Sequence, residues 1–203
     1  YWSAIELPSA VWVCNVAGAE LEQVLTDWCF TRWALAPRWV RSAAAAHGIV
    51  NAYADPTRLG ADRWVAMIGA RALFGLPVCV LSLGTAVTVD LVDAGGCHRG
   101  GLIAPGLTLM KDSLLRRAGD VRPEAVVEVP DFWGRDSGAC LESGVLQMAA
   151  ALINRAARKA EQDLGASPTL VLTGGDANAV APWLSVHHIM VPDLVLQGLA
   201  RCG

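Results

Sequence analysis

The sequence carries little charge. Asp, Glu, Lys and Arg make up 17% of its 203 residues, and the formal net charge is −3, so we expect no basic surface for nucleic acid. Long apolar runs are also missing. Although 54% of the residues are hydrophobic, each run is broken by charge, Gly or Pro before the roughly 18 residues that a membrane helix needs. We therefore predict no membrane partner.

Paired cysteine motifs are missing as well. The six cysteines are scattered without a Cys-x-x-Cys pair. We interpret Cys14 and Cys79, which lie in apolar strand-like runs, as core residues, and we expect a reduced, cytoplasmic setting. The adjacent His187 and His188 have no third ligand nearby in the sequence, so we expect no metal there. We interpret Cys97-His98 as part of an exposed hairpin loop.

What the sequence does contain is an acid beside a base at a glycine turn, Gly60-x-Asp62-Arg63. The apolar residues of 64–74 recur at helical spacing, which places the pair at a helix N-terminus, where a carboxylate is stabilised. A capping Asp beside a solvated Arg would explain this pattern. The alternative is catalytic: Asp62 accepts a proton from a substrate hydroxyl while Arg63 binds a substrate carboxylate with its planar fork.

Two further glycine turns follow apolar runs. The first joins two strands of a segment that we predict to be an antiparallel meander, and the second ends a strand before a helix. Either turn can offer backbone N–H groups to a nucleotide phosphate, and a purely structural turn would explain either one. The turns are Gly84-Thr85 within the meander 78–106 and Gly174-Gly175 after the strand 169–173.

Periodicity and breakers predict the other elements. Gly75-Leu76-Pro77 divides the chain into two halves, 1–76 and 77–203. In the first half we predict a strand at 10–18, an amphipathic helix at 19–30, an irregular segment or strand at 31–41, a loop at 50–61 and a helix ending near Phe74. In the second half we predict helices near 107–118 and 138–164, a helix near 178–183 and a terminal helix from Asp193.

In this order the motifs resemble the type III pantothenate kinases, and they look closest to the branch that includes the Bordetella accessory-factor proteins. The resemblance covers nearly the whole chain. It implies an α/β, actin/hexokinase-type fold with two ribonuclease H-like halves around a nucleotide cleft. It implies phosphorylation of pantothenate by ATP and Mg²⁺, the first step of coenzyme A biosynthesis, in a homodimer for which helix 138–164 is our candidate interface. The matching segments are 13–18, 53–64, 84–90, 100–106, 143–144, 173–175 and 194–199.

The resemblance also assigns roles to residues. Asp62 is implied to be the general base. Ser137 stands where the family has a Thr that touches pantothenate, and it keeps the hydroxyl group. The implied pantothenate pocket consists of Tyr53, Gly60, Ala61, Asp62, Arg63 and Ser137, and the implied ATP-binding residues are Gly84, Thr85, Gly174 and Gly175.

Two features depart from the family pattern. Ser82 stands where many members carry an Asp that binds a monovalent cation, so we assign no metal ligand there and leave K⁺ or NH₄⁺ as an optional cofactor. The opening Asp-x-Gly-Asn-Thr/Ser turn of the family, which holds ATP phosphates and magnesium, does not occur in the sequence. We therefore expect that segment to be missing and the chain as written to lack full kinase activity. The alternative function is a non-catalytic regulatory or binding protein that retains the kinase fold.

Overall fold

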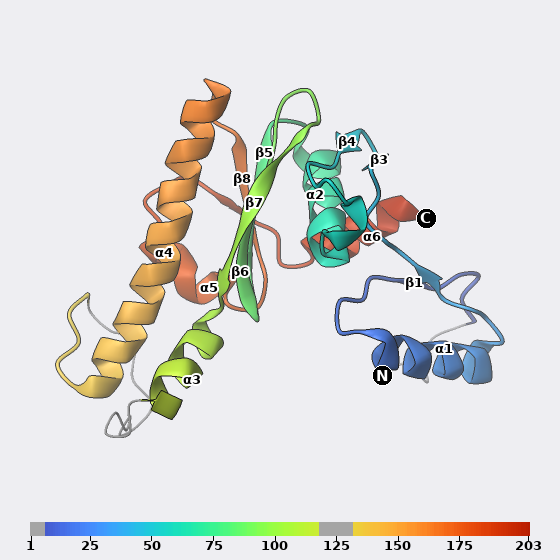
Figure 1. The fold of residues 1–203 in the computed structure, drawn as a ribbon, viewed down its shortest axis with the longest axis horizontal. Helices are drawn as coiled ribbons and strands as arrows, with labels where there is room; N and C mark the ends of the chain where they lie inside the picture. Colours follow the sequence, from blue (N-terminus) through green and yellow to red (C-terminus); the bar gives the residue numbers. More distant parts are fainter. Residues whose placement is uncertain (1–6, 118–131) are drawn as a thin grey trace.

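A five-stranded sheet lies at the centre of the computed structural model, which describes residues 7–117 and 132–203 (Figure 1). The strand order is β7-β6-β5-β8-β9. Strands β5, β6 and β7 form the predicted antiparallel meander, and β8 and β9 run parallel to β5. The strands are β5 (Val78–Leu83), β6 (Ala86–Val92), β7 (His98–Pro105), β8 (Thr169–Thr173) and β9 (Ile189–Met190).

Helices cover both faces of this sheet, because side chains of β5 are apolar on both sides. Residues alternate between faces along a strand. Cys79, Leu81 and Leu83 therefore lie in one core with α4, whereas Val78 and Val80 lie in a second core with α2 and α6. In Figure 1, α4 stands on the left of the sheet and α2 on the right. These helices are α2 (Ala61–Phe74), α4 (Ser137–Leu164) and α6 (Leu194–Cys202).

The sheet confirms the predicted fold class. If its five strands are numbered along the chain, their order across the sheet is 3-2-1-4-5, and the second strand is antiparallel to the first. With helices on both faces, this is the arrangement of a ribonuclease H-like half. The predicted helices near 107–118 and 178–183 are also present. The first is α3 (Leu107–Arg117), and the second is divided into α5 (Ala177–Val180) and the 3₁₀ turn η3 (Ala181–Trp183). The division of the chain at residue 76 stays a prediction.

The N-terminal segment forms less regular structure than we predicted. The strand expected at 10–18 is reduced to β1 (Trp12–Val13), which pairs in parallel with β2 (Arg38–Trp39). The helix expected at 19–30 is present as α1 (Ala19–Trp33), but Cys29 is its only buried residue. The amphipathic prediction for α1 is therefore wrong in this structure, where α1 lies away from the sheet (Figure 1).

A short hairpin that the sequence did not predict sets the start of the 50–61 loop. Its strands, β3 (Ala45–Ala46) and β4 (Ile49–Val50), are two residues long, and the loop after them contains the 3₁₀ turn η2 (Pro56–Arg58). The N–H of Val50 donates to the carbonyl of Gly96 at 2.9 Å. The loop therefore leaves the hairpin directly beside the turn between β6 and β7.

Helices α2 and α6 approach each other closely. A Cβ at Gly198 of α6 would lie 2.0 Å from the carbonyl oxygen of Val65 on α2, so only glycine permits this crossing. Within residues 7–117 and 132–203, no helix combines the length and the apolar character that crossing a bilayer requires.

Candidate active site

Asp62 and Arg63 lie in the first turn of α2, as predicted. Gly60 is the N-cap, and its φ of −55° is open to any residue. A Cβ there would lie 2.6 Å from Oδ1 of Asp62, so a larger residue would displace that carboxylate. That oxygen accepts the N–H of Arg63 at 2.8 Å. Asp62 is thus held, half-buried, in the first turn of α2, where Gly60 and not Asp62 is the N-cap.

Arg63 is not solvated, contrary to the structural alternative. Only 7% of the residue is exposed. Its Nε and Nη2 donate to the two carboxylate oxygens of Asp90 at 2.8 and 2.6 Å, and Nη1 donates to the hydroxyl of Tyr53 at 3.0 Å. Burial lowers the pKa of Arg63, and the hydrogen bond and charge of Asp90 outweigh this, so that the net shift is upward.

His98 completes this cluster, and our interpretation of it as an exposed loop residue is wrong. It is 3% exposed, and its Nε2 lies 3.0 Å from Oδ1 of Asp90. The N–H of Ala52 points to Nδ1 at 3.5 Å. Because Nδ1 accepts, Nε2 carries the ring proton and donates to Asp90. Cys97, its neighbour, is exposed as predicted.

The loop at Tyr53 is fixed over the same cluster. The Tyr53 ring stacks on His98 with 6.2 Å between centroids and 14° between planes. The side chain of Asn51 accepts the Tyr53 N–H at 3.0 Å and donates to the carbonyls of Ala43 and Pro56. The structure therefore brings together Tyr53, Gly60, Asp62 and Arg63 of the predicted pocket, with Ala61 buried in the first turn of α2.

The two predicted phosphate turns lie side by side. Strands β5 and β8 are parallel neighbours, with Ser82 opposite Thr173, so both turns leave the same edge of the sheet. A Cβ at Gly174, where φ is +100°, would lie 2.1 Å from the carbonyl oxygen of Leu83. The Gly84 N–H is used inside its own turn, donating to Ala86 at 3.0 Å, whereas Thr85 is exposed. Gly84 therefore shapes the turn, and Thr85 supplies the accessible groups.

Ser137 is the predicted pocket residue that this chain does not bring to the cluster. It begins α4, on the opposite face of the sheet from α2 (Figure 1). Ser82 is half-buried in β5, opposite Thr88 of β6 and Thr173 of β8. No group of three metal-binding side chains occurs in the described part of the chain, so the pair His187-His188 has no third ligand there.

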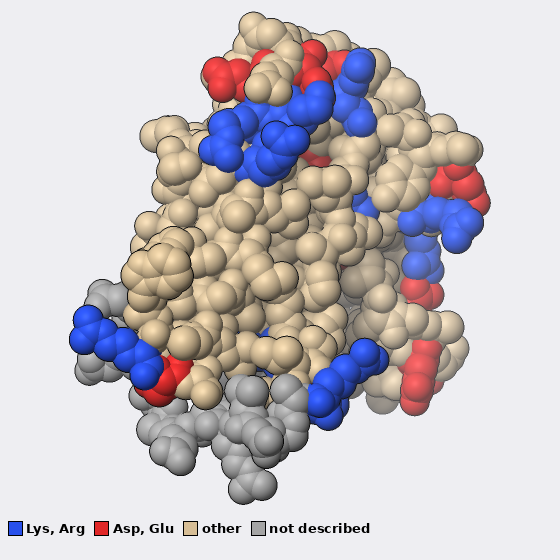
Figure 2. Space-filling view, turned by 60° about the vertical axis from the view of Figure 1, so that its left-hand side comes forward, with Lys and Arg blue, Asp and Glu red and all other residues tan. Residues whose placement is uncertain are grey.

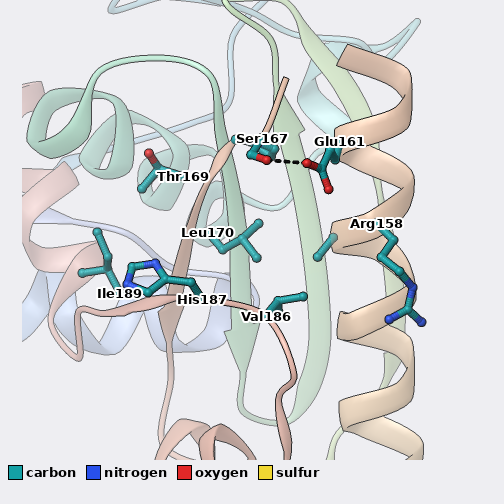
Figure 3. Close-up of a pocket in the computed structure, with 10 residues that line it drawn as sticks. Arg158, Glu161, Ser167, Thr169, Leu170, Val186, His187 and Ile189 are labelled. Carbon is teal, nitrogen blue, oxygen red and sulfur yellow. Dashed lines mark hydrogen bonds between the residues drawn. The ribbon is translucent and has the colours of Figure 1, made fainter. Parts of the chain in front are cut away.

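A cavity of about 380 Å³ lies elsewhere, between the C-terminal part of α4 and strand β8 (Figure 3). Glu161 accepts the hydroxyl of Ser167 at its rim, at 2.6 Å. Arg158 and His187 border the same cavity. None of the predicted site residues lines it, and it is separate from the Arg63 cluster.

The sequence contained a signal for one of the two residues that we missed. Asp90 lies on the same face of β6 as the buried Val92, which lies in the core with α2, and an acid on a core face of a strand needs a charged partner. Arg63 is that partner. No comparable signal marked His98. It contacts Ala52, which is 46 positions away in the sequence, and Asp90, which is 8 positions away.

Comparison with known proteins supports the same assignment. The sequence model of the type III pantothenate kinase family matches residues 2–159. A type III pantothenate kinase of Azoarcus is 44% identical over 187 residues, covering 92% of this chain and 69% of that protein. The corresponding protein of Burkholderia mallei is 38% identical over 213 residues, covering 98% of this chain and 83% of that protein.

A solved structure agrees on the fold. The crystal structure of a Baf family protein from Campylobacter jejuni superposes with a TM-score of 0.61 at 18% identity, covering 98% of this chain and 84% of that one. Because the family match spans more than half of the sequence and the relatives match it at 38–44% identity, this chain belongs to the type III pantothenate kinases.

Proposed function

We propose that this chain transfers the γ-phosphoryl group of ATP to pantothenate, giving 4′-phosphopantothenate in the first step of coenzyme A biosynthesis. One observation carries the proposal. In this chain, which belongs to the family, Asp62 and Arg63 lie together at the N-terminus of α2, and Arg63 is bound to Tyr53 and Asp90. An acceptor for a proton and a cation for a carboxylate thus lie in consecutive residues. The use of ATP supports a cytoplasmic setting.

Arg63 is proposed to bind the carboxylate of pantothenate. A guanidinium has five N–H donors, and Asp90 and Tyr53 take three of them. One N–H on each terminal nitrogen is left, which is the number that a carboxylate accepts in a two-point contact. Tyr53, which binds Arg63, and Gly60 and Ala61, which lie at the start of α2, are proposed to line the pocket.

Asp62 is proposed to be the general base. Among the described residues, its hydrogen bond goes to Oδ1 alone, which leaves Oδ2 for the primary alcohol of pantothenate. By accepting that proton as the oxygen attacks the γ-phosphorus, Asp62 would activate the alcohol. The neighbouring helix N-terminus attracts this negative charge and helps to hold the side chain in place.

The ATP phosphates are proposed to meet Thr85 and the turn at Gly174 and Gly175. Asp90 pairs with Val80 on β5, and Gly84 lies four residues farther along, about 13 Å at the rise of a β-strand. A divalent metal bound to ATP would neutralise charge on the phosphates. The described residues offer no cluster of three ligands for it, so we assign no protein ligand, and with Ser82 in β5 we assign none to a monovalent cation.

A homodimer is the proposed assembly. The exposed side of α4 carries an uncharged stripe at helical spacing, formed by Cys140, Gly144, Met148 and Ala151. Figure 2 shows the left-hand side of the molecule brought forward, with a broad uncharged surface between charged residues above and below it. Such a surface supports contact with a second copy. Because Ser137 opens the same helix, a dimer would also give it a route to the pocket of the partner.

The test is a kinase assay with the full-length protein, pantothenate and ATP, for wild type and Asp62→Asn. Asp62→Asn should lower kcat by roughly 10²–10⁴, the effect of losing a general base, with little change in the KM for ATP. Asp112→Asn, an exposed acid on α3, serves as the control. Unchanged turnover in Asp62→Asn would remove Asp62 from the base role. A wild type that binds pantothenate without turnover would favour the binding-protein alternative.

A further inference from the structure

We propose that Asp90 and His98 are positioning residues for Arg63, and that they determine the selectivity for an acidic substrate without touching it. This inference rests on the proposed function of Arg63 as the carboxylate-binding group. Asp90 and His98 are 1% and 3% exposed, so neither reaches the space in which a substrate would bind. Both are absent from our sequence-based assignment of the pocket.

Asp90 fixes the orientation of the guanidinium. Its two oxygens take Nε and Nη2 of Arg63 at 2.8 and 2.6 Å, a two-point contact that allows only one rotation of the planar group. The two N–H groups that are left therefore point away from Asp90 in a set direction. A single-point contact would leave the guanidinium free to turn.

His98 fixes Asp90 in turn. Its Nε2–H donates to Oδ1 of Asp90, the same oxygen that accepts Nη2 of Arg63. On its other side, His98 accepts the N–H of Ala52 and lies against the ring of Tyr53. His98 therefore connects the loop that carries Tyr53 to the strand that carries Asp90, and both Tyr53 and Asp90 bind Arg63.

Strand β7 closes the remaining side of this cluster. Gly101 lies opposite Asp90 in the β6–β7 register. A Cβ at Gly101 would lie 2.4 Å from Nη2 of Arg63 and 2.5 Å from Oδ1 of Asp90, so the backbone of β7 covers the ion pair directly. A rotation of the guanidinium would break both of its hydrogen bonds to Asp90 while the backbone of Gly101 lies against the pair.

Two substitutions of similar size separate positioning from packing. His98→Asn places an amide near Nδ1 and keeps an acceptor for Ala52, but it cannot reach Asp90. His98→Gln extends to the position of Nε2 and can still donate to Asp90. His187→Asn, at an exposed histidine far from the cluster, is the matched control. Asp90→Asn keeps the shape of the carboxylate and removes its charge.

The measurement is the ratio of kcat/KM for pantothenate to kcat/KM for its uncharged primary amide, together with the KM for ATP and a thermal unfolding curve for each variant. We expect His98→Asn and Asp90→Asn to lower the acid-to-amide ratio about tenfold, the effect of one charge-assisted hydrogen bond, through the KM for pantothenate rather than kcat. His98→Gln should recover most of the ratio.

Three results would count against the proposal. An unchanged ratio in folded His98→Asn overturns it. Equal losses for the acid and the amide also overturn it, because they indicate a general structural role. A loss in His98→Gln as large as that in His98→Asn overturns the link through Asp90. If Asp90→Asn does not fold, the two His98 variants decide the outcome. A wild type that phosphorylates neither substrate is distinguishable from these results, because it overturns the proposed function itself.

Discussion

At the scale of single residues, the positively charged side chain of the candidate site, Arg63, is already paired before any substrate binds. Arg63 already has a carboxylate partner in Asp90, so the pair carries no net charge. An incoming carboxylate would therefore gain little from long-range attraction and would depend on the direction of the two N–H groups that remain. A buried ion pair in this position supplies geometry more than stability.

Arg63→Leu should accordingly raise the KM for pantothenate roughly ten- to a hundredfold, the loss expected from one or two charge-assisted hydrogen bonds. The KM for ATP should change little, because the turn at Gly84 lies about 13 Å farther along the strands than Asp90. Steady-state kinetics with each substrate varied would measure this. Arg58→Leu, an exposed arginine in the neighbouring η2, is the control. If the uncharged amide bound to wild type as tightly as pantothenate does, the carboxylate role of Arg63 would be wrong.

The sequence could propose Asp62, Arg63 and Thr85 as site residues, because each stands at a turn whose residues are adjacent in the chain, and their roles stay predictions. It could not identify the state of Arg63, since its partner Asp90 is 27 residues away. His98 was misjudged for the same reason. A glycine-rich hairpin is usually exposed, and only the approach of the β3–β4 hairpin, through Val50 and Gly96, covers this one.

At the scale of elements, the placement of α2 depends on its contact with α6. Glycine at position 198 allows the two helix backbones to meet. Since α2 carries Asp62 and Arg63 at its first turn, a shift of α6 would be transmitted to the site through a rigid helix.

Gly198→Ala should therefore lower the free energy of unfolding by roughly 1–3 kcal/mol, the range for overpacking a close contact. Chemical denaturation would measure it. Leu196→Ala, at a side chain on the same helix that is 66% exposed, should change stability by less than about 0.5 kcal/mol. Equal effects from the two substitutions would contradict the close-contact explanation.

Helices and strands were predicted correctly where a single segment is long enough to show a hydrophobic period. The helices α2, α3 and α4 and strands β5, β6 and β8 are long enough for periodicity to indicate them, and all are present near the expected residues. The strands β3, β4 and β9 are two residues long. Strands that short are stabilised by their partners rather than by their own residues, so no local pattern could predict them.

At the scale of the whole molecule, the uncharged side of α4 and α3 is an apolar surface that the described part of the chain leaves uncovered. A groove of about 440 Å³ between these helices is lined by Met110, Leu114, Leu141 and Met148, and Met148 is 62% exposed. Among the described residues nothing covers this apolar surface, and the proposed dimer would bury it.

Met148→Glu should shift the protein from dimer to monomer, because a buried carboxylate without a partner opposes association. Sedimentation measured over a range of concentrations would detect the shift. Gln162→Glu, which adds the same charge at an exposed position near the end of α4, should leave the association unchanged. A wild type that is monomeric at all concentrations would be incompatible with the proposed assembly.

Because Cys79 is buried in the core, its reaction with a thiol reagent can report unfolding of the central sheet. Burial, and secondarily the charge of Asp90, raise the pKa of this thiol to about 12, and alkylating reagents attack the thiolate. At pH 8, exposed Cys97 and Cys140 should react quickly with N-ethylmaleimide, whereas Cys79 should react only through unfolding of the sheet. Mass spectrometry of timed samples would resolve the two phases, and Gly198→Ala should speed the slow one. Labelling of Cys79 as fast as that of Cys97 would contradict this expectation. The rate of the slow phase would then record how often the centre of the sheet is exposed to water, without any denaturant.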